Sequence, residues 1–242
     1  MDIFNIKLEF DHDTFRHAVN NCIAEKGKGY VCVVDGNVLS QAQFDESYNK
    51  VINGCLVNTC DSSFVAIMAN HVYKTHYTSL NGPMIFEEYI EKPYKQLLLG
   101  NTEDNFKAIA SELKKRTGDN SSLHYIPLPF CGVNEFDYKG IAEKVNELKP
   151  DIIWVSLGAP KQEIFMSKLE SYINSGVMFG IGAAFNFYSG MLDKTELHVG
   201  GQRMIWLQRI FQEPKKQIRR CWHFVKVIPG LVRSEKKKAR KK

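Results

Sequence analysis

Residues 151–163 have the sequence DIIWVSLGAPKQE, in which a strongly apolar run leads into a turn rich in Gly, Pro and polar side chains. A short apolar run bounded by turn residues is typical of a buried strand in a parallel sheet. A turn with a flexible Gly158, a rigid Pro160 and the polar Lys161 can direct backbone N–H groups and an ammonium toward a phosphate. On these residues alone, a tight turn in which Glu163 acts as a cap is an equally good interpretation.

The same order of strand, turn and helix recurs along the chain. Apolar strands are predicted within 29–34, 55–60, 96–102, 122–128 and 176–181, and helices at 37–53, 103–115, 138–148 and 164–171. This alternation predicts an α/β fold with a mostly parallel, doubly wound (Rossmann-like) sheet. Asp35 and Asp61 each follow a strand, so both carboxylates are expected at strand carboxyl ends, where open α/β sheets bind ligands.

Both ends of the chain carry a feature with two interpretations. Asp11-His12-Asp13 matches a D-x-D triplet that can hold a divalent metal, but its place before a helical pattern favours an acidic helix cap. Pro214 is predicted to begin a helix with an apolar and a cationic face, formed respectively by Ile218, Trp222 and Val225 and by Lys216, Arg219, Arg220 and His223. Such a helix suits a membrane surface or an anionic ligand, and the alternative is a helix docked on the body by its apolar face.

Composition limits the class of protein. The 242 residues are 44% hydrophobic and 24% charged, which excludes disordered, collagen-like and disulfide-scaffold classes. No run reaches about 18 apolar residues, so no spanning helix is expected. The first residues lack the basic and apolar regions of a signal peptide, and the six cysteines, which show no C-x-x-C spacing, are expected to be reduced.

The net charge of +5 is divided unevenly along the chain. Residues 203–242 carry fourteen Lys and Arg against two acids, whereas the remainder carries eighteen against twenty-five. An acidic body with a basic tail predicts an anionic partner, which could be nucleic acid, phosphate groups or an anionic membrane face. For residues 236–242, a merely solvated tail is an equal alternative.

Most common catalytic motifs are missing from the sequence. There is no P-loop, no G-x-S-x-G nucleophile motif, and the Gly180-Ile181-Gly182 segment lacks the third glycine of a dinucleotide fingerprint. The seven histidines form no H-x-x-x-H pair, so a zinc site is not expected. Nothing in the sequence suggests flavin or haem, and no cofactor is predicted.

Three ordered motifs carry a resemblance to a known family. They read GAPKQE at 158–163, GIGAAFNFYSG at 180–190 and WLQRIFQEP at 206–214. With these motifs the chain resembles the WecG/TagA/CpsF family of bacterial glycosyltransferases. The resemblance implies inverting, metal-independent transfer of a sugar, usually from a UDP-sugar donor, to a polyprenyl-diphosphate-linked sugar. Such enzymes serve the synthesis of teichoic acid linkage units, enterobacterial common antigen, capsules and exopolysaccharides.

The resemblance also assigns roles to residues of this chain. Asp61, which lies 26 residues after Asp35, corresponds to the general base, and Gln162 corresponds to an active-site Gln. Arg209, Lys216 and Arg219 fall where the family's C-terminal appendage carries functional arginines. Further substrate-binding positions are Asp35, Gly82, Gly100, Gly158, Pro160, Lys161, Glu163, Ala184, Phe185, Asn186 and Lys194, with no metal or cofactor. The chain departs from the family pattern at Asp35, Asn186, Lys194 and Ile205, so the two sugars stay open.

Two parts of the chain are predicted. An α/β core at 1–200 comprises a catalytic-Asp half at about 1–93 and a nucleotide-binding half at about 94–200, and a basic helical appendage follows at 201–242. The expected partners are the UDP-sugar donor, the lipid-linked acceptor and an anionic membrane surface, with no nucleic acid. The expected location is cytoplasmic, peripheral to the inner face of the bacterial plasma membrane. A catalytically silent sugar-nucleotide-binding member, a nucleic-acid-binding module and a homo-oligomer stay open.

Overall fold

The central element of the computed structural model is a six-stranded sheet with the strand order β4-β3-β8-β7-β5-β6, in which every neighbouring pair is parallel. The structure describes residues 1–182, 184–188, 198–199, 202–203 and 214–240. The strands are β3 (Lys28–Val34), β4 (Val57–Cys60), β5 (Gln96–Leu99), β6 (Leu123–Ile126), β7 (Ile152–Val155) and β8 (Gly176–Gly180). Two antiparallel pairs lie outside this sheet: β1 (Asp2–Ile3) with β2 (Ile6–Lys7), and β9 (His198–Val199) with β10 (Gln202–Arg203).

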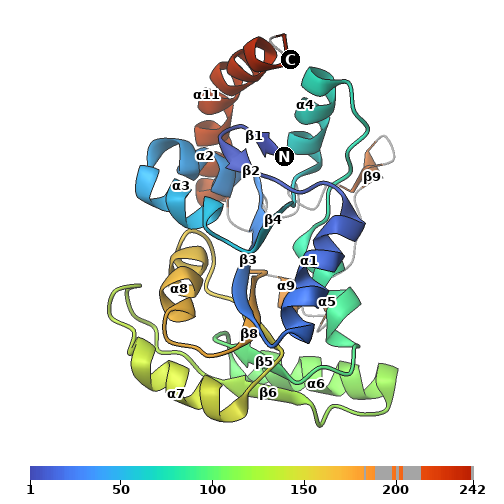
Figure 1. Cartoon of the computed structure of the whole chain (residues 1–242), viewed down its shortest axis with the longest axis vertical. Helices are drawn as coiled ribbons and strands as arrows, with labels where there is room; N and C mark the ends of the chain where they lie inside the picture. The colour runs from blue at the N-terminus through green and yellow to red at the C-terminus, as the bar shows by residue number, and fades with distance from the viewer. Residues whose placement is uncertain (183, 189–197, 200–201, 204–213, 241–242) are drawn as a thin grey trace.

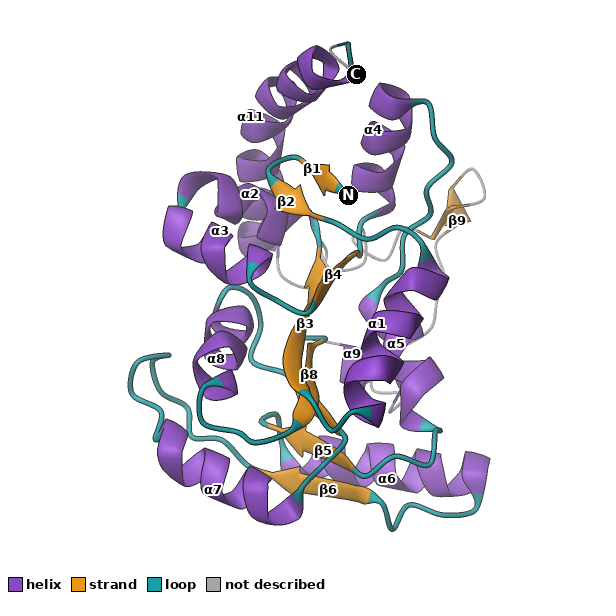
Figure 2. Ribbon diagram, in the orientation of Figure 1, coloured by secondary structure: helices purple, strands orange, loops and turns teal. Residues whose placement is uncertain are grey.

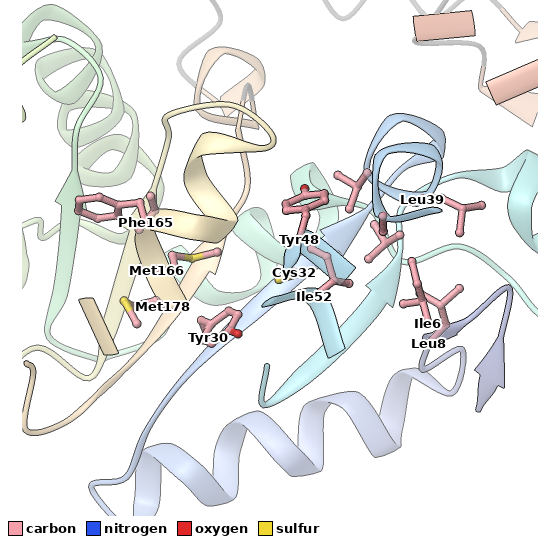
Figure 3. Packing of buried hydrophobic residues seen from close by; sticks show 14 of the residues in the cluster. Ile6, Leu8, Tyr30, Cys32, Leu39, Tyr48, Ile52, Phe165, Met166 and Met178 are labelled. Atoms are coloured by element: carbon pink, nitrogen blue, oxygen red, sulfur yellow. The ribbon is translucent and has the colours of Figure 1, made fainter. Parts of the chain in front are cut away.

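Helices cover both faces of the sheet, as Figure 2 shows. Along β3, Tyr30 and Cys32 belong to one buried cluster and Val31 and Val33 to the other, because successive side chains of a strand point to opposite faces. The first cluster, part of which is drawn in Figure 3, involves α2 (Gly36–Phe44), α3 (Glu46–Asn53), α4 (Ser63–Tyr73), α7 (Tyr138–Leu148) and α8 (Lys161–Glu170). The second involves α1 (His12–Ala24), α5 (Gly82–Ile90), α6 (Glu103–Thr117) and α9 (Ala184–Tyr188). The predicted doubly wound α/β class is confirmed.

At two places in the sheet, the chain leaves neighbouring strands in opposite directions along the strand order. β5 lies between β6 and β7, and β3 lies between β4 and β8. In open parallel sheets, such points leave a crevice outside the strand carboxyl ends, where ligands bind. The segments that follow the six strands therefore meet at one edge, and these segments contain Asp35, Asp61, Gly100, Gly158 and Gly182.

Some local elements differ from the prediction. The single helix expected at 37–53 is two helices, because the Asp45 carboxylate accepts hydrogen bonds from the Tyr48 N–H (3.0 Å) and the Ser47 hydroxyl (2.6 Å) and so begins α3. Helix α8 begins at Lys161 rather than Ile164, so the PKQE residues form its first turn. Asp11 caps α1 by accepting from the Thr14 N–H at 2.7 Å, which confirms the predicted helix cap.

The C-terminal helix α11 (Pro214–Ala239) begins at the predicted proline and lies against α2 and α4 (Figure 1). Of the predicted apolar face, the two described side chains, Trp222 and Val225, are each 60% exposed and do not dock on the body. Contact is made instead by a neighbouring stripe that includes Phe224, Ile228 and Leu231. Glu235, which is 1% exposed, accepts hydrogen bonds from the Phe4 N–H, the Tyr73 hydroxyl and Lys238. The helix is therefore anchored to the N-terminal part of the body.

Candidate active site at the carboxyl edge of the sheet

Asp61 directly follows β4 and is half-buried. Its N–H donates to the Val34 carbonyl at 3.0 Å, which continues the pairing of β4 with β3 beyond the last strand residue. Its side-chain Oδ1 accepts a hydrogen bond from the N–H of Gly82 at 3.0 Å. Gly82, which the sequence predicted to contact substrate, is therefore placed against the predicted general base.

Asp35 lies on the same edge, one strand away, but its carboxylate is engaged differently. Its Oδ1 accepts from the N–H groups of Asn37 (2.9 Å) and Val38 (2.8 Å), so Asp35 is the N-cap of α2. The Nδ2 of Asn37 beside it is buried and has no hydrogen-bond partner among the described residues. The two strand-end carboxylates thus lie at one edge as predicted, held by different helices.

Gln162 connects three segments of the second half of the site. Its Oε1 accepts from the Gly158 N–H (3.2 Å), and its Nε2 donates to the Gly180 carbonyl (3.1 Å) and to the Glu163 carboxylate (2.8 Å). The side chain is 5% exposed. Gln162 therefore braces the turn after β7 against the end of β8.

Glu163 is fully buried beneath this turn. Its second oxygen accepts from the Tyr48 hydroxyl at 3.1 Å, which joins α8 to α3. Burial raises the pKa of Glu163 to about 7 against its own hydrogen bonds, which favour the charged form, and burial likewise raises the pKa of Tyr48. Glu163, predicted to bind substrate, is placed as a buried support for Gln162.

Other predicted residues shape the turns. Gly158 and Gly100 have φ of +75° and +86°, which glycine adopts without strain, and a Cβ on Gly158 would meet no atom within 4 Å. Pro160 is the N-cap of α8. The Lys161 ammonium donates to the Cys131 carbonyl and lies 4.9 Å from the centre of the Phe136 ring, so it is engaged by the loop after β6.

The segment after β8 combines a turn with core packing. Ala184 and Phe185, both predicted at the substrate site, are buried, and the Phe185 ring lies 5.2 Å from that of Phe86 on α5. Ser156, which the sequence did not single out, donates from its hydroxyl to the Gly182 carbonyl at 2.7 Å. This bond ties the turn after β7 to the turn after β8. In the sequence, the one sign of this contact is a serine directly after an apolar strand.

Several predicted residues lie outside the described part of the chain. Lys194 and Arg209 are not among the described residues, and neither are the side chains of Asn186 on α9 and of Lys216 and Arg219 on α11. Helix α11 nevertheless crosses near the two strand-end aspartates. A Cβ on Gly36, next to Asp35, would lie 3.0 Å from the Phe224 ring, and that ring is 5.7 Å from Phe64, three residues after Asp61.

Within the described ranges, no group of three or more His, Cys, Asp or Glu side chains is arranged to hold a metal ion. Among the helices that the structure describes, none has both the length and the apolar character needed to cross a membrane.

These features define an α/β protein whose candidate site lies at the carboxyl edge of a parallel sheet, with an aspartate at one strand end and a braced glycine turn at another. The chain belongs to the glycosyl transferase WecG/TagA/CpsF family, whose model matches residues 1–242. The family resemblance predicted from the three motifs is thereby confirmed.

Curated relatives from Staphylococcus aureus carry the name N-acetylglucosaminyldiphosphoundecaprenol N-acetyl-beta-D-mannosaminyltransferase. The relative from strain MW2 is 22% identical over 218 residues, covering 86% of this chain and 84% of the relative. The relative from strain NCTC 8325 has the same identity and coverage. The chain is thus a distant but nearly full-length relative of these enzymes.

Proposed function

We propose that the protein is an inverting glycosyltransferase that moves a sugar from a UDP-sugar to a polyprenyl-diphosphate-linked sugar in the synthesis of a bacterial cell-surface polysaccharide. The observation that carries this proposal is the half-buried Asp61 carboxylate at the end of β4, held by the N–H of Gly82 in a chain of this family. The names of the relatives make UDP-N-acetylmannosamine the first donor to test, and a diphosphoundecaprenol-linked N-acetylglucosamine the first acceptor.

Asp61 is assigned as the general base. The acceptor hydroxyl forms a bond to the anomeric carbon as the bond from that carbon to the UDP oxygen breaks, and the electron pair leaves with UDP. The hydroxyl proton passes to the Asp61 carboxylate. Because the hydroxyl attacks from the face opposite UDP, the anomeric centre is inverted. A carboxylate within hydrogen-bond reach of the attacking hydroxyl typically contributes about 10²–10⁴-fold in rate.

The leaving diphosphate is assigned to the turn after β7. Gly158 leaves open space where a side chain would stand, and the first turn of α8 follows at once, so backbone dipoles can approach a phosphate there. Positive charge near this group stabilises the charge that develops as UDP leaves. Lys216 and Arg219 are proposed to supply it, because α11 crosses the same edge of the sheet at Gly36. Arg209 is proposed beside them on the family resemblance alone.

A surface on α2, α4 and α11 suits a peripheral contact with the membrane that holds the acceptor. Large apolar side chains are exposed there: Phe44, Phe64, Ile67, Trp222 and Val225. Exposed basic residues lie along the same C-terminal helix: Lys226, Arg233, Lys236, Lys237, Lys238 and Arg240. Anionic lipids attract such residues by about 1 kcal/mol each. We therefore place the enzyme at the inner face of the plasma membrane.

The proposal is tested by measuring UDP release from a panel of UDP-sugars with a synthetic polyprenyl-diphosphate N-acetylglucosamine. We expect release that depends on acceptor for one donor, with an inverted anomeric centre in the product by NMR. Binding of UDP-sugars without turnover on any pair would instead identify a catalytically silent member, and a retained anomeric centre would contradict the single displacement.

The membrane contact has its own measurement. Sedimentation with vesicles of anionic lipid should exceed that with neutral lipid, weaken with salt, and fall further in a Trp222→Ser, Val225→Ser variant. Salt-sensitive retention on DNA without vesicle binding would favour a nucleic-acid partner for the basic helix.

A further inference from the structure

The end of β4 is extended by a segment that does not belong to the sheet. The N–H of Leu80 donates to the Cys60 carbonyl at 2.9 Å, and the buried Thr59 hydroxyl donates to the Leu80 carbonyl at 2.5 Å. These two bonds hold the chain before α5 alongside the strand that ends at Asp61. The start of α5 is therefore fixed relative to the carboxylate by both main chain and side chain.

Helix α5 presents its first N–H group to Asp61. Asn81 is its N-cap and accepts from the Met84 N–H at 3.0 Å, and Gly82 is the first helical residue. N–H groups of a first helical turn have no partner within the helix, so that of Gly82 is available to the Asp61 Oδ1. A carboxylate at this end also benefits from the positive end of the helix dipole.

The position of Gly82 is fixed from the other side as well. A Cβ there would lie 3.4 Å from the Ile181 carbonyl and 3.8 Å from the Ala184 Cβ, so the helix start is wedged against the turn after β8. One turn further, the Phe86 ring lies 4.8 Å from that of the buried Trp154. The donor is therefore packed between the turn after β8 on one side and buried aromatic rings one helical turn further on.

We propose that the Gly82 N–H, supported by Thr59, is a positioning group for the base: it keeps Asp61 ionised and directed at the acceptor hydroxyl. This inference rests on the assignment of Asp61 as general base. It also gives Gly82 a role other than substrate contact. A charge-assisted hydrogen bond of this kind is stronger than a neutral one, so its loss should be visible in turnover.

The test compares Gly82→Pro with Gly82→Ala. Both variants place a Cβ at this site and share the restriction imposed by the following Pro83, but only proline removes the N–H. Proline is favoured at the first helical position, and the extended backbone of Asn81 (ψ 162°) suits a residue before proline. In Gly82→Pro the ring Cδ also takes the place of the amide hydrogen and presses on the Asp61 Oδ1, so the variant both removes the donor and displaces the carboxylate. The Thr59 pair described below tests the same contact without adding atoms beside Asp61.

We expect kcat of Gly82→Pro to be lower than that of Gly82→Ala by about 10–100-fold, as a charge-assisted bond implies. The acidic limb of the pH–kcat profile should move to higher pH, while KM for the donor and UDP binding stay unchanged. Equal kcat and equal pH profiles in two folded variants would overturn the positioning role.

A second pair covers the case in which Gly82→Pro does not fold. Thr59→Val keeps the shape but loses the donor to Leu80, whereas Thr59→Ser keeps it. Thr59→Val should show the same pH displacement with a smaller loss of kcat, and Thr59→Ser should restore both; matching profiles for the two would overturn the proposal. Asp61→Asn, run alongside, separates the two ideas. If Asp61→Asn is inactive and the two Gly82 variants have equal kcat and equal pH profiles, the positioning role is overturned and Asp61 remains the base. If Asp61→Asn is active, both the assignment of Asp61 as base and the positioning role are overturned.

Discussion

The polar side chains that follow β4 and β7 differ in exposure: Asp61 after β4 is half-buried, whereas Gln162 and Glu163 after β7 are buried. At β4, Asp61 is half-buried and accepts from the backbone at the start of a helix. At β7, Gln162 and Glu163 are buried and bond to each other, to Gly158, to Gly180 and to Tyr48. A group that exchanges a proton with substrate must stay accessible, whereas a group that shapes a turn is best sealed from water. This comparison supports the proposal that the first site carries the chemistry and that the second fixes the backbone.

Asp61→Asn is the largest test of this contrast. The amide keeps an oxygen for the Gly82 N–H but cannot take a proton, so turnover should fall about 10²–10⁴-fold, roughly 2.7–5.5 kcal/mol of transition-state stabilisation. UDP binding and thermal unfolding should stay near wild type. The matched control is Asp35→Asn, which preserves an N-cap side chain and should stay within a few-fold of wild type. Wild-type turnover in Asp61→Asn would refute its assignment as base.

Glu163→Gln tests the buried cluster at the end of β7 through the pH dependence of the free energy of unfolding. Because the folded-state pKa is about 7 and the ordinary value is 4.5, the folded protein holds a proton between these values that the unfolded chain has released. Stability therefore falls as pH rises through this window, by on the order of 3 kcal/mol. The variant cannot ionise, so urea unfolding should find it more stable than wild type at pH 8 and similar at pH 4.5. Parallel pH curves for the two proteins would contradict the shifted pKa.

Gln162→Leu should weaken the brace without touching the base. The variant leaves the Gly158 N–H and the Gly180 carbonyl without this partner, and an unsatisfied buried group costs about 1–3 kcal/mol. We expect a lower unfolding free energy together with weaker UDP binding, because the turn after β7 is no longer held to β8. If UDP binding is unchanged while stability falls, the brace does not shape the donor site.

Chelation should have the smallest effect. Asp11 of the D-x-D triplet caps α1, so the sequence motif closest to a metal site is used in helix formation. Transfer in EDTA should stay within about twofold of the untreated enzyme, as the family resemblance implies. If chelation stops transfer and Mg²⁺ or Mn²⁺ restores it, Asp11 and Asp13 need to be reconsidered as ligands.

Much of the fold was predictable because its signals are local. Apolar runs bounded by turn residues located the strands, and helix 138–148 was predicted with the bounds found for α7. The errors are local as well. Nothing in the pattern at 37–53 revealed that the Asp45 side chain would bond to the Tyr48 N–H and split the helix. The face by which α11 docks also escaped prediction, because the apolar residues of that helix occupy more than one side.

The sequence named candidate site residues but could not predict their contacts. The PKQE motif identified Gln162 and Glu163, yet Tyr48, the hydroxyl partner of Glu163, lies 115 residues earlier and carries no motif. Gly82 was predicted as a substrate contact, but its N–H meets Asp61, 21 positions away in sequence. Residues that act through a backbone N–H leave little trace in the side-chain pattern.

The sequence by itself determined the class of this protein: the alternation of strands and helices, the family motifs, the basic C-terminal region, and an aspartate after each of the first two core strands. Only the tertiary structure decided which strands are neighbours, that α5 begins beside Asp61, and that Glu163, in the first turn of α8, is buried against Tyr48 of α3. The physical reason is that local pattern depends on neighbours in the chain. Hydrogen bonds and burial at the sheet edge instead depend on segments that meet only when the parallel sheet has assembled.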